Sequence, residues 1–172
     1  MGRRTSEQVL EFTTGSVEET QAFGERLGRA LRPGDVIALS GALGSGKTTL
    51  MQGIAQGLGR DAETIKSPTF VLLREYPGEA PLVHIDGYRL EGAPAAAWLD
   101  VELLFSPDKI TVIEWAERFG DLLPEARLDI QLAHVSTNRR RISLRSNAPR
   151  WQTVIEKLRQ DPAQKTEPTQ PT

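Results

Sequence analysis

The sequence of 172 residues contains no cysteine, and this absence excludes disulfide bonds, thiolate metal sites and cysteine nucleophiles. It also has no apolar run that approaches the roughly 18 residues of a membrane-spanning helix. The first residues, MGRRTSEQVLEF, lack the continuous apolar segment of a signal peptide. We therefore expect a soluble, cytoplasmic protein that does not contact the membrane.

A strong charge of either sign is also missing, because 21 basic and 23 acidic residues leave a net charge of −2. This balance argues against nucleic-acid binding driven by bulk charge, so any such contact needs a local basic patch. Hydrophobic residues make up 38% of the chain and charged residues 26%, as in globular proteins. We expect residues 1–160 to form a single domain and residues 161–172, which have almost nothing to bury, to be a disordered tail.

The hydrophobic patterning alternates between segments typical of strands and segments typical of helices. Ser16 and Glu19 form a capping-box pattern at the start of the first predicted helix, and short polar connections at 77–80 and 136–138 predict two hairpins. We predict strands over 8–14, 35–41, 69–76, 81–86, 109–115, 126–135 and 139–146, and helices over 17–31, 47–59, 93–105 and 148–160. This order predicts the α/β class, with a mixed, mostly parallel central sheet flanked by helices.

The segment GALGSGKT, residues 41–48, matches the phosphate-binding pattern G-x-x-x-x-G-K-[ST] without a mismatch. Glycines allow backbone N–H groups to turn toward one point, and the helix that begins at the lysine adds its positive end. We expect Lys47 to reach the β- and γ-phosphate oxygens and Thr48 to ligate Mg²⁺. The alternative is a glycine-rich turn that only caps a helix. A buried strand before the motif and an amphipathic helix after it favour the P-loop of an NTPase.

A P-loop needs a carboxylate near its Mg²⁺, usually at the C-terminal end of a neighbouring strand. Two acids have this position, Asp86 after the run PLVHI and Glu114 after the run KITVI. The alternative for Asp86 is an Asx-turn or a helix cap, and the alternative for Glu114 is the first turn of a short helix. Because a P-loop domain must supply an acid, we favour the metal site for both and expect them to point into one crevice.

Several other polar segments have two interpretations each. KSPTF, residues 66–70, can close over a γ-phosphate like a GTPase switch loop, or it can form an ordinary turn at Pro68. The arginines between residues 139 and 150 can contact RNA or the nucleotide base, but on a hairpin we favour a solvated face. His84 and His134 lie in predicted strands without metal-ligand spacing, which indicates structural roles. The guanine-specifying pattern N-K-x-D does not occur, and this favours ATP over GTP.

Four motifs occur in an order and at separations that point to one family. GALGSGKTT, SPTF, HIDGYRL and VIEW together resemble the TsaE (YjeE) family of small bacterial P-loop ATPases. Members of that family take part in making threonylcarbamoyladenosine at position 37 of tRNA. The resemblance covers roughly residues 8–145. The P-loop alone is unspecific, but the other three motifs together are diagnostic.

The resemblance implies an ATP-binding and ATP-hydrolysing, Mg²⁺-dependent accessory protein that acts on a complex of TsaD and TsaB and meets tRNA through that complex. It implies catalytic roles for Lys47, Asp86 and Glu114. Of the implied metal-site residues Thr48, Glu114 and Asp86, Glu114 resembles the metal-associated acid and Asp86 the acid needed for hydrolysis. Asp86 is expected either to ligate Mg²⁺ or to orient water. The residues expected to contact the nucleotide are Val17, Leu43, Gly44, Ser45, Gly46, Lys47, Thr48, Thr49, Thr69, Trp115 and Arg139.

The sequence departs from the family pattern in one segment. EGAPAAAWLDVELLF is richer in alanine than the family's usual acidic helix, and Asp100 stands near a position where glycine is common. Two other classes of function fit the same P-loop, a small-molecule kinase and a nucleotide-dependent binding switch. Such kinases usually carry an arginine-bearing lid and an acceptor pocket, neither of which is identifiable in the sequence, so the ATPase is the leading hypothesis.

Overall fold

The computed structural model describes residues 8–68, 72–90 and 99–161. Within them, seven strands form one sheet in the order β1-β7-β6-β2-β5-β4-β3. The strands are β1 (Gln8–Thr14), β2 (Val36–Ser40), β3 (Leu73–Tyr76), β4 (Leu82–Asp86), β5 (Ile110–Glu114), β6 (Leu128–His134) and β7 (Arg140–Ser146). The central strands β6, β2, β5 and β4 pair in parallel, and the pairs at both edges are antiparallel. The predicted α/β class with a mixed sheet is confirmed.

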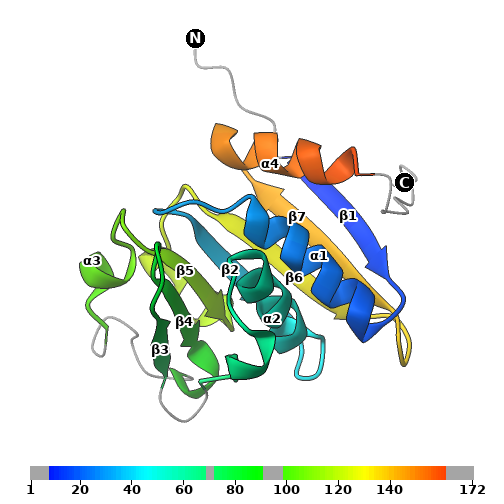
Figure 1. Cartoon of the computed structure of the whole chain (residues 1–172), viewed down its shortest axis with the longest axis horizontal. Coiled ribbons are helices and arrows are strands. Elements are labelled where there is room, and N and C mark those ends of the chain that lie inside the picture. The colour runs from blue at the N-terminus through cyan, green and yellow to red at the C-terminus, as the bar shows by residue number, and fades with distance from the viewer. Residues whose placement is uncertain (1–7, 69–71, 91–98, 162–172) are drawn as a thin grey trace.

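Three helices cover one face of the sheet, namely α1 (Val17–Arg29), α2 (Lys47–Gly57) and α4 (Pro149–Arg159) (Figure 1). An apolar cluster beneath them includes Phe23, Leu50 and Trp151. A second cluster includes Ile85, Leu104 and Phe119 and involves short elements. These are α3 (Val101–Leu104) and the 3-10 segments η2 (Gly87–Leu90), η4 (Ala116–Arg118) and η5 (Gly120–Leu122), while η1 (Ala62–Thr64) follows α2. Among the described helices, none has both the length and the apolar character that crossing a bilayer requires.

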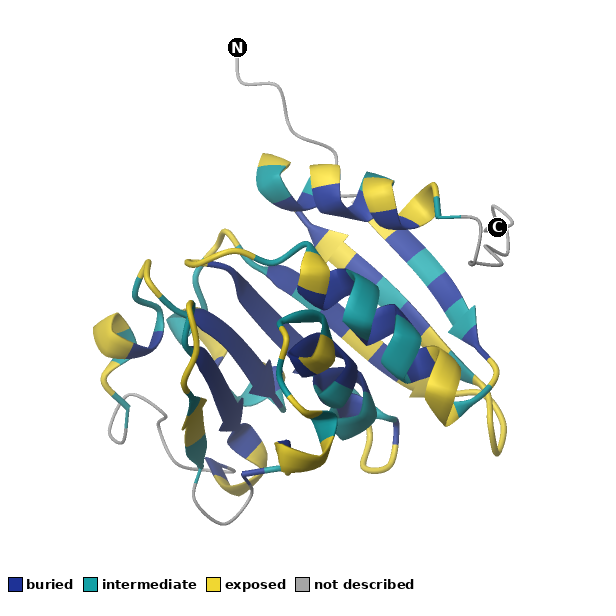
Figure 2. Ribbon diagram, viewed as in Figure 1, coloured by how far each residue is buried: buried dark blue, intermediate teal, exposed yellow. Residues whose placement is uncertain are grey.

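Burial differs between the two halves of the sheet. Every residue of β4 and β5 is buried, as expected for parallel strands that are covered on both faces (Figure 2). In β6 and β7 buried residues alternate with exposed or half-buried ones, because only the face toward the helices is covered. The strands that end in Asp86 and Glu114 therefore form the most buried part of the sheet.

Helices α1 and α2 pack at unusually short range because glycines lie at their contact. A Cβ atom added at Gly24 or Gly28 would lie 2.5 or 2.3 Å from a carbonyl oxygen of α2. At Gly53 and Gly57 it would lie 2.2 Å from a carbonyl oxygen of α1. Since real Cβ atoms do not approach oxygen so closely, any side chain at these positions would force the helices apart. This glycine contact fixes the distance between α1 and α2, and the first turns of both helices line the same cavity.

The predicted elements are found with boundaries within two residues, except for two. The predicted strand 69–76 begins only at Leu73, because Leu72 has a left-handed backbone with φ 66°, and residues 69–71 lie outside the described part. The predicted helix 93–105 is helical over Val101–Leu104, where Asp100 accepts a hydrogen bond from the Leu103 N–H and starts the helix. Residues 93–98 lie outside the described ranges, as does the predicted tail beyond Asp161.

Candidate functional site

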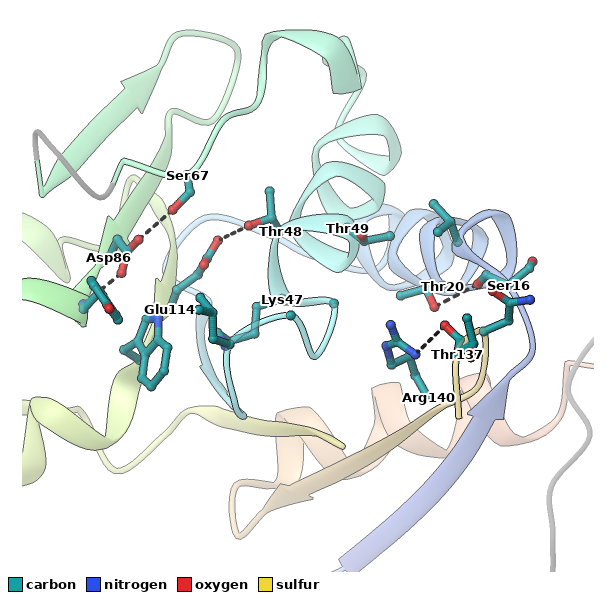
Figure 3. A pocket seen from close by; sticks show the side chains of 17 residues that line it. Ser16, Thr20, Lys47, Thr48, Thr49, Ser67, Asp86, Glu114, Thr137 and Arg140 are labelled. Carbon is teal, nitrogen blue, oxygen red and sulfur yellow. Dashed lines mark hydrogen bonds between the residues drawn. The ribbon is translucent and has the colours of Figure 1, made fainter. Parts of the chain in front are cut away.

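A cavity of about 470 Å³ lies at the carboxyl ends of β2, β4 and β5, beside the first turns of α1 and α2 (Figure 3). Ligands bind at this edge in open α/β sheets, and the volume is in the range of small-molecule sites. The residues that line it are Ser16, Val17, Thr20, Leu43, Gly44, Gly46, Lys47, Thr48, Thr49, Ser67, Asp86, Tyr88, Glu114, Trp115, Thr137, Asn138 and Arg140.

The loop between β2 and α2 turns on glycines with positive φ. The φ angles are 141° at Gly41, 76° at Gly44 and 103° at Gly46, and only glycine adopts such angles without strain. Gly46 is the N-cap of α2, so it supplies no side-chain cap, and the first turn contains no acid. Within the described residues, none accepts a hydrogen bond from the amides of Lys47, Thr48 or Thr49. This helix start therefore presents free donors and a positive dipole end to the cavity.

Lys47 is a buried cation at the centre of the site. Its Nζ donates to the carbonyl oxygens of Gly41 at 2.6 Å and Ala42 at 2.9 Å and lies 4.3 Å from the centroid of the Trp115 ring. Burial lowers the pKa of Lys47, and the negative charges of Glu114, Glu117 and Asp86 oppose that shift. An anion in the cavity would add to the opposing charges and favour the protonated lysine.

Asp86 and Glu114 end neighbouring parallel strands and are paired residues in the sheet register. Both are buried, at 2% and 3% exposure, and both side chains point into the cavity, as the sequence predicts (Figure 3). The Thr48 hydroxyl donates to Glu114 Oε1 at 3.4 Å, and His84 Nε2 lies 2.9 Å from the same oxygen. The first residues of α2 and the end of β5 thus meet at one carboxylate oxygen.

Both interpretations of Asp86 describe part of its environment. Its Oδ1 accepts from the Tyr88 N–H at 2.9 Å, which is an Asx-turn, and its Oδ2 accepts from the Ser67 hydroxyl at 2.6 Å. The turn therefore holds the carboxylate in place while the carboxylate faces the cavity. Ser67 and Pro68 of the predicted switch-like segment are described, whereas Thr69 lies outside the described residues.

An aromatic wall closes the side of the cavity next to the acids. Trp115 follows Glu114 directly and has a left-handed backbone with φ 55°, which is uncommon for a residue other than glycine. Its ring lies 5.3 Å from that of Tyr88, and the Arg118 guanidinium lies 5.1 Å from the Trp115 ring. The sharp backbone turn ends β5 at Glu114 and allows the indole to lie beside Lys47.

The other end of the cavity is more apolar and more open. Val17 at the start of α1 is 58% exposed, and Leu43 at the tip of the loop is 79% exposed. The turn between β6 and β7 also contributes Thr137, Asn138 and Arg140 to the lining. Arg140 donates to the carbonyl oxygen of Ser136 at 2.9 Å and to that of Thr137 at 3.3 Å, so it holds this turn in shape.

The oxygen donors of the site fit Mg²⁺. Thr48 offers a hydroxyl, and Asp86 and Glu114 offer carboxylates, which are the ligand types that Mg²⁺ prefers. In the described ranges, no group of three or more histidine, cysteine or acidic side chains is placed to hold an ion by itself.

Most residues that the sequence predicts for the site line this cavity. The exceptions are Ser45, which is buried below the loop, Arg139, which is exposed and outside the lining, and Thr69, which is not described. Arg140, the first residue of β7, lines the cavity instead of Arg139, which belongs to the turn before the strand. The lining residues Thr20, Thr137, Asn138 and Arg140 were not among the predicted site residues, although helical spacing from Ser16 is a signal for Thr20.

Comparisons with known proteins agree with this geometry. A family profile described as "Threonylcarbamoyl adenosine biosynthesis protein TsaE" matches residues 14–142. The tRNA threonylcarbamoyladenosine biosynthesis protein TsaE of Bacillus subtilis is 35% identical over 150 residues, which cover 87% of this chain and 93% of that protein. The protein of that name from Streptomyces coelicolor is 41% identical over 141 residues, covering 77% and 93%. The crystal structure of Bacillus subtilis YdiB superposes with a TM-score of 0.74 and 32% identity, covering 89% of this chain and 95% of that one.

Proposed function

The chain belongs to the TsaE family of threonylcarbamoyl adenosine biosynthesis proteins, and from this membership we propose that it is a Mg²⁺-dependent ATPase. Its role is that of an accessory protein in the cytoplasm, required for the threonylcarbamoyladenosine modification of tRNA at position 37. It acts on a complex of TsaD and TsaB and meets tRNA through that complex.

The observation that carries the proposal is the start of α2. Its first amides have no acceptor among the described residues, it has no acid in its first turn, and it begins with a buried lysine. Such a helix start favours an anion, and a P-loop directs it at the β- and γ-phosphates. The amides of Gly44 and of residues 46–49 bind the phosphate oxygens, and Lys47 neutralises their charge.

The metal position is supported by the convergence of Thr48 and Glu114. Mg²⁺, when bound with ATP, neutralises the charge that develops on the transferred phosphoryl group. Thr48 and Glu114 would hold the ion, and their polar atoms already lie 3.4 Å apart. Asp86 lies one strand further along the sheet, where it would hold the ion or orient the attacking water. In the second role its carboxylate would accept a hydrogen bond from that water.

The nucleoside would occupy the open end of the cavity. Val17 and Leu43 provide exposed apolar side chains on which a base can pack, and Thr137 and Asn138 line the same cavity. Adenine is favoured over guanine because the sequence lacks the N-K-x-D pattern. Phosphoryl transfer depends mainly on positioning and charge neutralisation, so we expect slow hydrolysis until a partner completes the site.

Phosphate release measured with and without TsaD and TsaB tests the function. We expect slow release by the chain alone and faster release with both partners present. Absence of release in both conditions would contradict the ATPase and leave a nucleotide-dependent binding switch. Transfer of radiolabelled phosphate to a metabolite instead of water would identify a kinase.

Asp86→Asn tests the assignment of the acid. The amide oxygen of asparagine can still accept from the Tyr88 N–H, so the Asx-turn is kept while the charge is removed. We expect ATP affinity within about threefold of the unchanged protein and a loss of turnover of about 100-fold. Unchanged turnover in this variant would refute the role of Asp86.

A further inference from the structure

His84 is a buried histidine whose side chain contacts the carboxylate of Glu114. It lies in β4 at 0% exposure, two residues before Asp86, and so its side chain leaves the same face of the strand. Its Nε2 lies 2.9 Å from Glu114 Oε1. Since a carboxylate only accepts hydrogen bonds, Nε2 carries the proton and donates it.

The other ring nitrogen of His84, Nδ1, is buried and forms no hydrogen bond to any described residue. A buried polar atom without a partner destabilises a fold, so an apolar residue at this position would suit the sheet better. The histidine is thus not explained by packing or stability, and its contact with Glu114 is its only polar interaction among the described residues.

The bond also determines where the Glu114 carboxylate points. His84 and Thr48 both contact Oε1, and no described residue donates to Oε2. Lys47 is a competing cation in the same cavity, and Glu114 is the carboxylate whose charge acts on it most strongly. Without the His84 bond the carboxylate is free to turn toward Lys47 and away from Thr48.

We propose that His84 is a positioning residue that holds Glu114 toward Thr48 for binding of Mg²⁺ with the nucleotide. The inference rests on the proposed function, because it assumes that the cavity binds a nucleotide with Mg²⁺. Hydrogen bonds to a metal-ligating carboxylate commonly set metal affinity, and their loss lowers it by about 10- to 100-fold.

The test is calorimetric titration with a non-hydrolysable ATP analogue, once with Mg²⁺ and once with EDTA. The readout is the ratio of the two dissociation constants, which does not depend on turnover. We expect His84→Leu to reduce the magnesium-dependent gain in affinity by about tenfold or more, with affinity in EDTA unchanged. His84→Gln, whose amide N–H can replace Nε2–H, should retain the gain. His134→Leu, at the only other histidine, is the control and should match the unchanged protein.

Thermal unfolding separates positioning from a structural role. His84→Leu removes an unpartnered buried nitrogen, so we expect its Tm to be unchanged or higher while the magnesium gain falls. An unchanged magnesium gain in His84→Leu would overturn the inference and leave the proposed function intact. A magnesium gain lost equally in His84→Gln would also overturn it. If the unchanged protein shows no magnesium gain, the proposed function fails and the inference fails with it.

Discussion

Helices α1 and α2 both begin at the same cavity, but only α1 has a side chain that caps the backbone amides of its first turn. Ser16 caps α1 by accepting from the Glu19 N–H at 3.1 Å, and Glu19 accepts in return from the Gly15 N–H at 2.6 Å. Two acids, Glu18 and Glu19, stand in its first turn. Helix α2 has a left-handed glycine in place of the capping residue and no acid. The difference supports the proposal that the start of α2 binds phosphates, whereas the start of α1 serves stability.

The largest expected effect is that of Lys47→Ala, which removes the charge at the start of α2. A charge-assisted hydrogen bond contributes about 1.5–3 kcal/mol, so we expect ATP affinity to fall by about 100-fold. Because burial already lowers the pKa of Lys47, the folded state should lose little stability. Calorimetric titration measures the affinity, and Lys157→Ala, at an exposed lysine of α4, is the control. ATP affinity equal to that of the control would contradict the claim that the start of α2, unlike that of α1, binds phosphate.

Gly53→Ala tests whether the two helix starts are held at a fixed spacing. The new Cβ would lie 2.2 Å from the Gln21 carbonyl oxygen, so the backbones must separate. Overpacking of this kind destabilises by about 1–3 kcal/mol, and urea denaturation should show it. Gln56→Ala, at an exposed position of the same helix, should leave the free energy of unfolding almost unchanged. Equal stability of the two variants would mean that the close contact is not required.

Thr49→Glu gives α2 the acid that it lacks. The acid at the third helical position should interact with the amides and the dipole, and so stabilise the unliganded protein by about 0.3–1 kcal/mol. The same charge lies in the cavity and repels phosphate, so ATP affinity should fall by about tenfold. Thr49→Gln controls for size. A stability gain without any loss of ATP affinity would show that the start of α2 does not bind the phosphates.

Ser16→Ala removes the cap of α1 and has the smallest expected effect on binding. Loss of an N-cap side chain costs about 1 kcal/mol, which should appear in the free energy of unfolding. ATP affinity should stay within about threefold, since α1 contributes no phosphate ligand. Ser16→Asn, which keeps a capping acceptor, should restore the stability. A loss of ATP affinity as large as that of Lys47→Ala would contradict the division between the helices.

The parts of this protein that the sequence predicts are those encoded by local patterns. The loop at 41–48 was identifiable because the glycines and the lysine are adjacent in the chain, and Asp86 and Glu114 because each ends an apolar run. The sheet order adds what no local pattern contains, namely that β4 and β5 are neighbours and that the two acids are paired in register.

Three other features that depend on distant segments were not predicted. His84 lacks metal-ligand spacing, and its role depends on the carboxylate of Glu114 in the next strand. The close packing of α1 and α2 depends on glycines in both helices, and only their shared spacing of four residues in each helix hints at it. Arg140 rather than Arg139 lines the cavity, and no local pattern distinguishes adjacent arginines at the point where the turn passes into β7.

The central claim is that the uncapped start of α2 receives the phosphates, and backbone amide NMR tests it most directly. A non-hydrolysable ATP analogue with Mg²⁺ is titrated into the isotopically labelled protein. We predict large shifts for the amides of Gly44 and residues 46–49 and small shifts for the amides of Glu19 and Thr20, which already donate to Ser16. Saturating shifts at the start of α1 with none at Gly44 or residues 46–49 would contradict the claim.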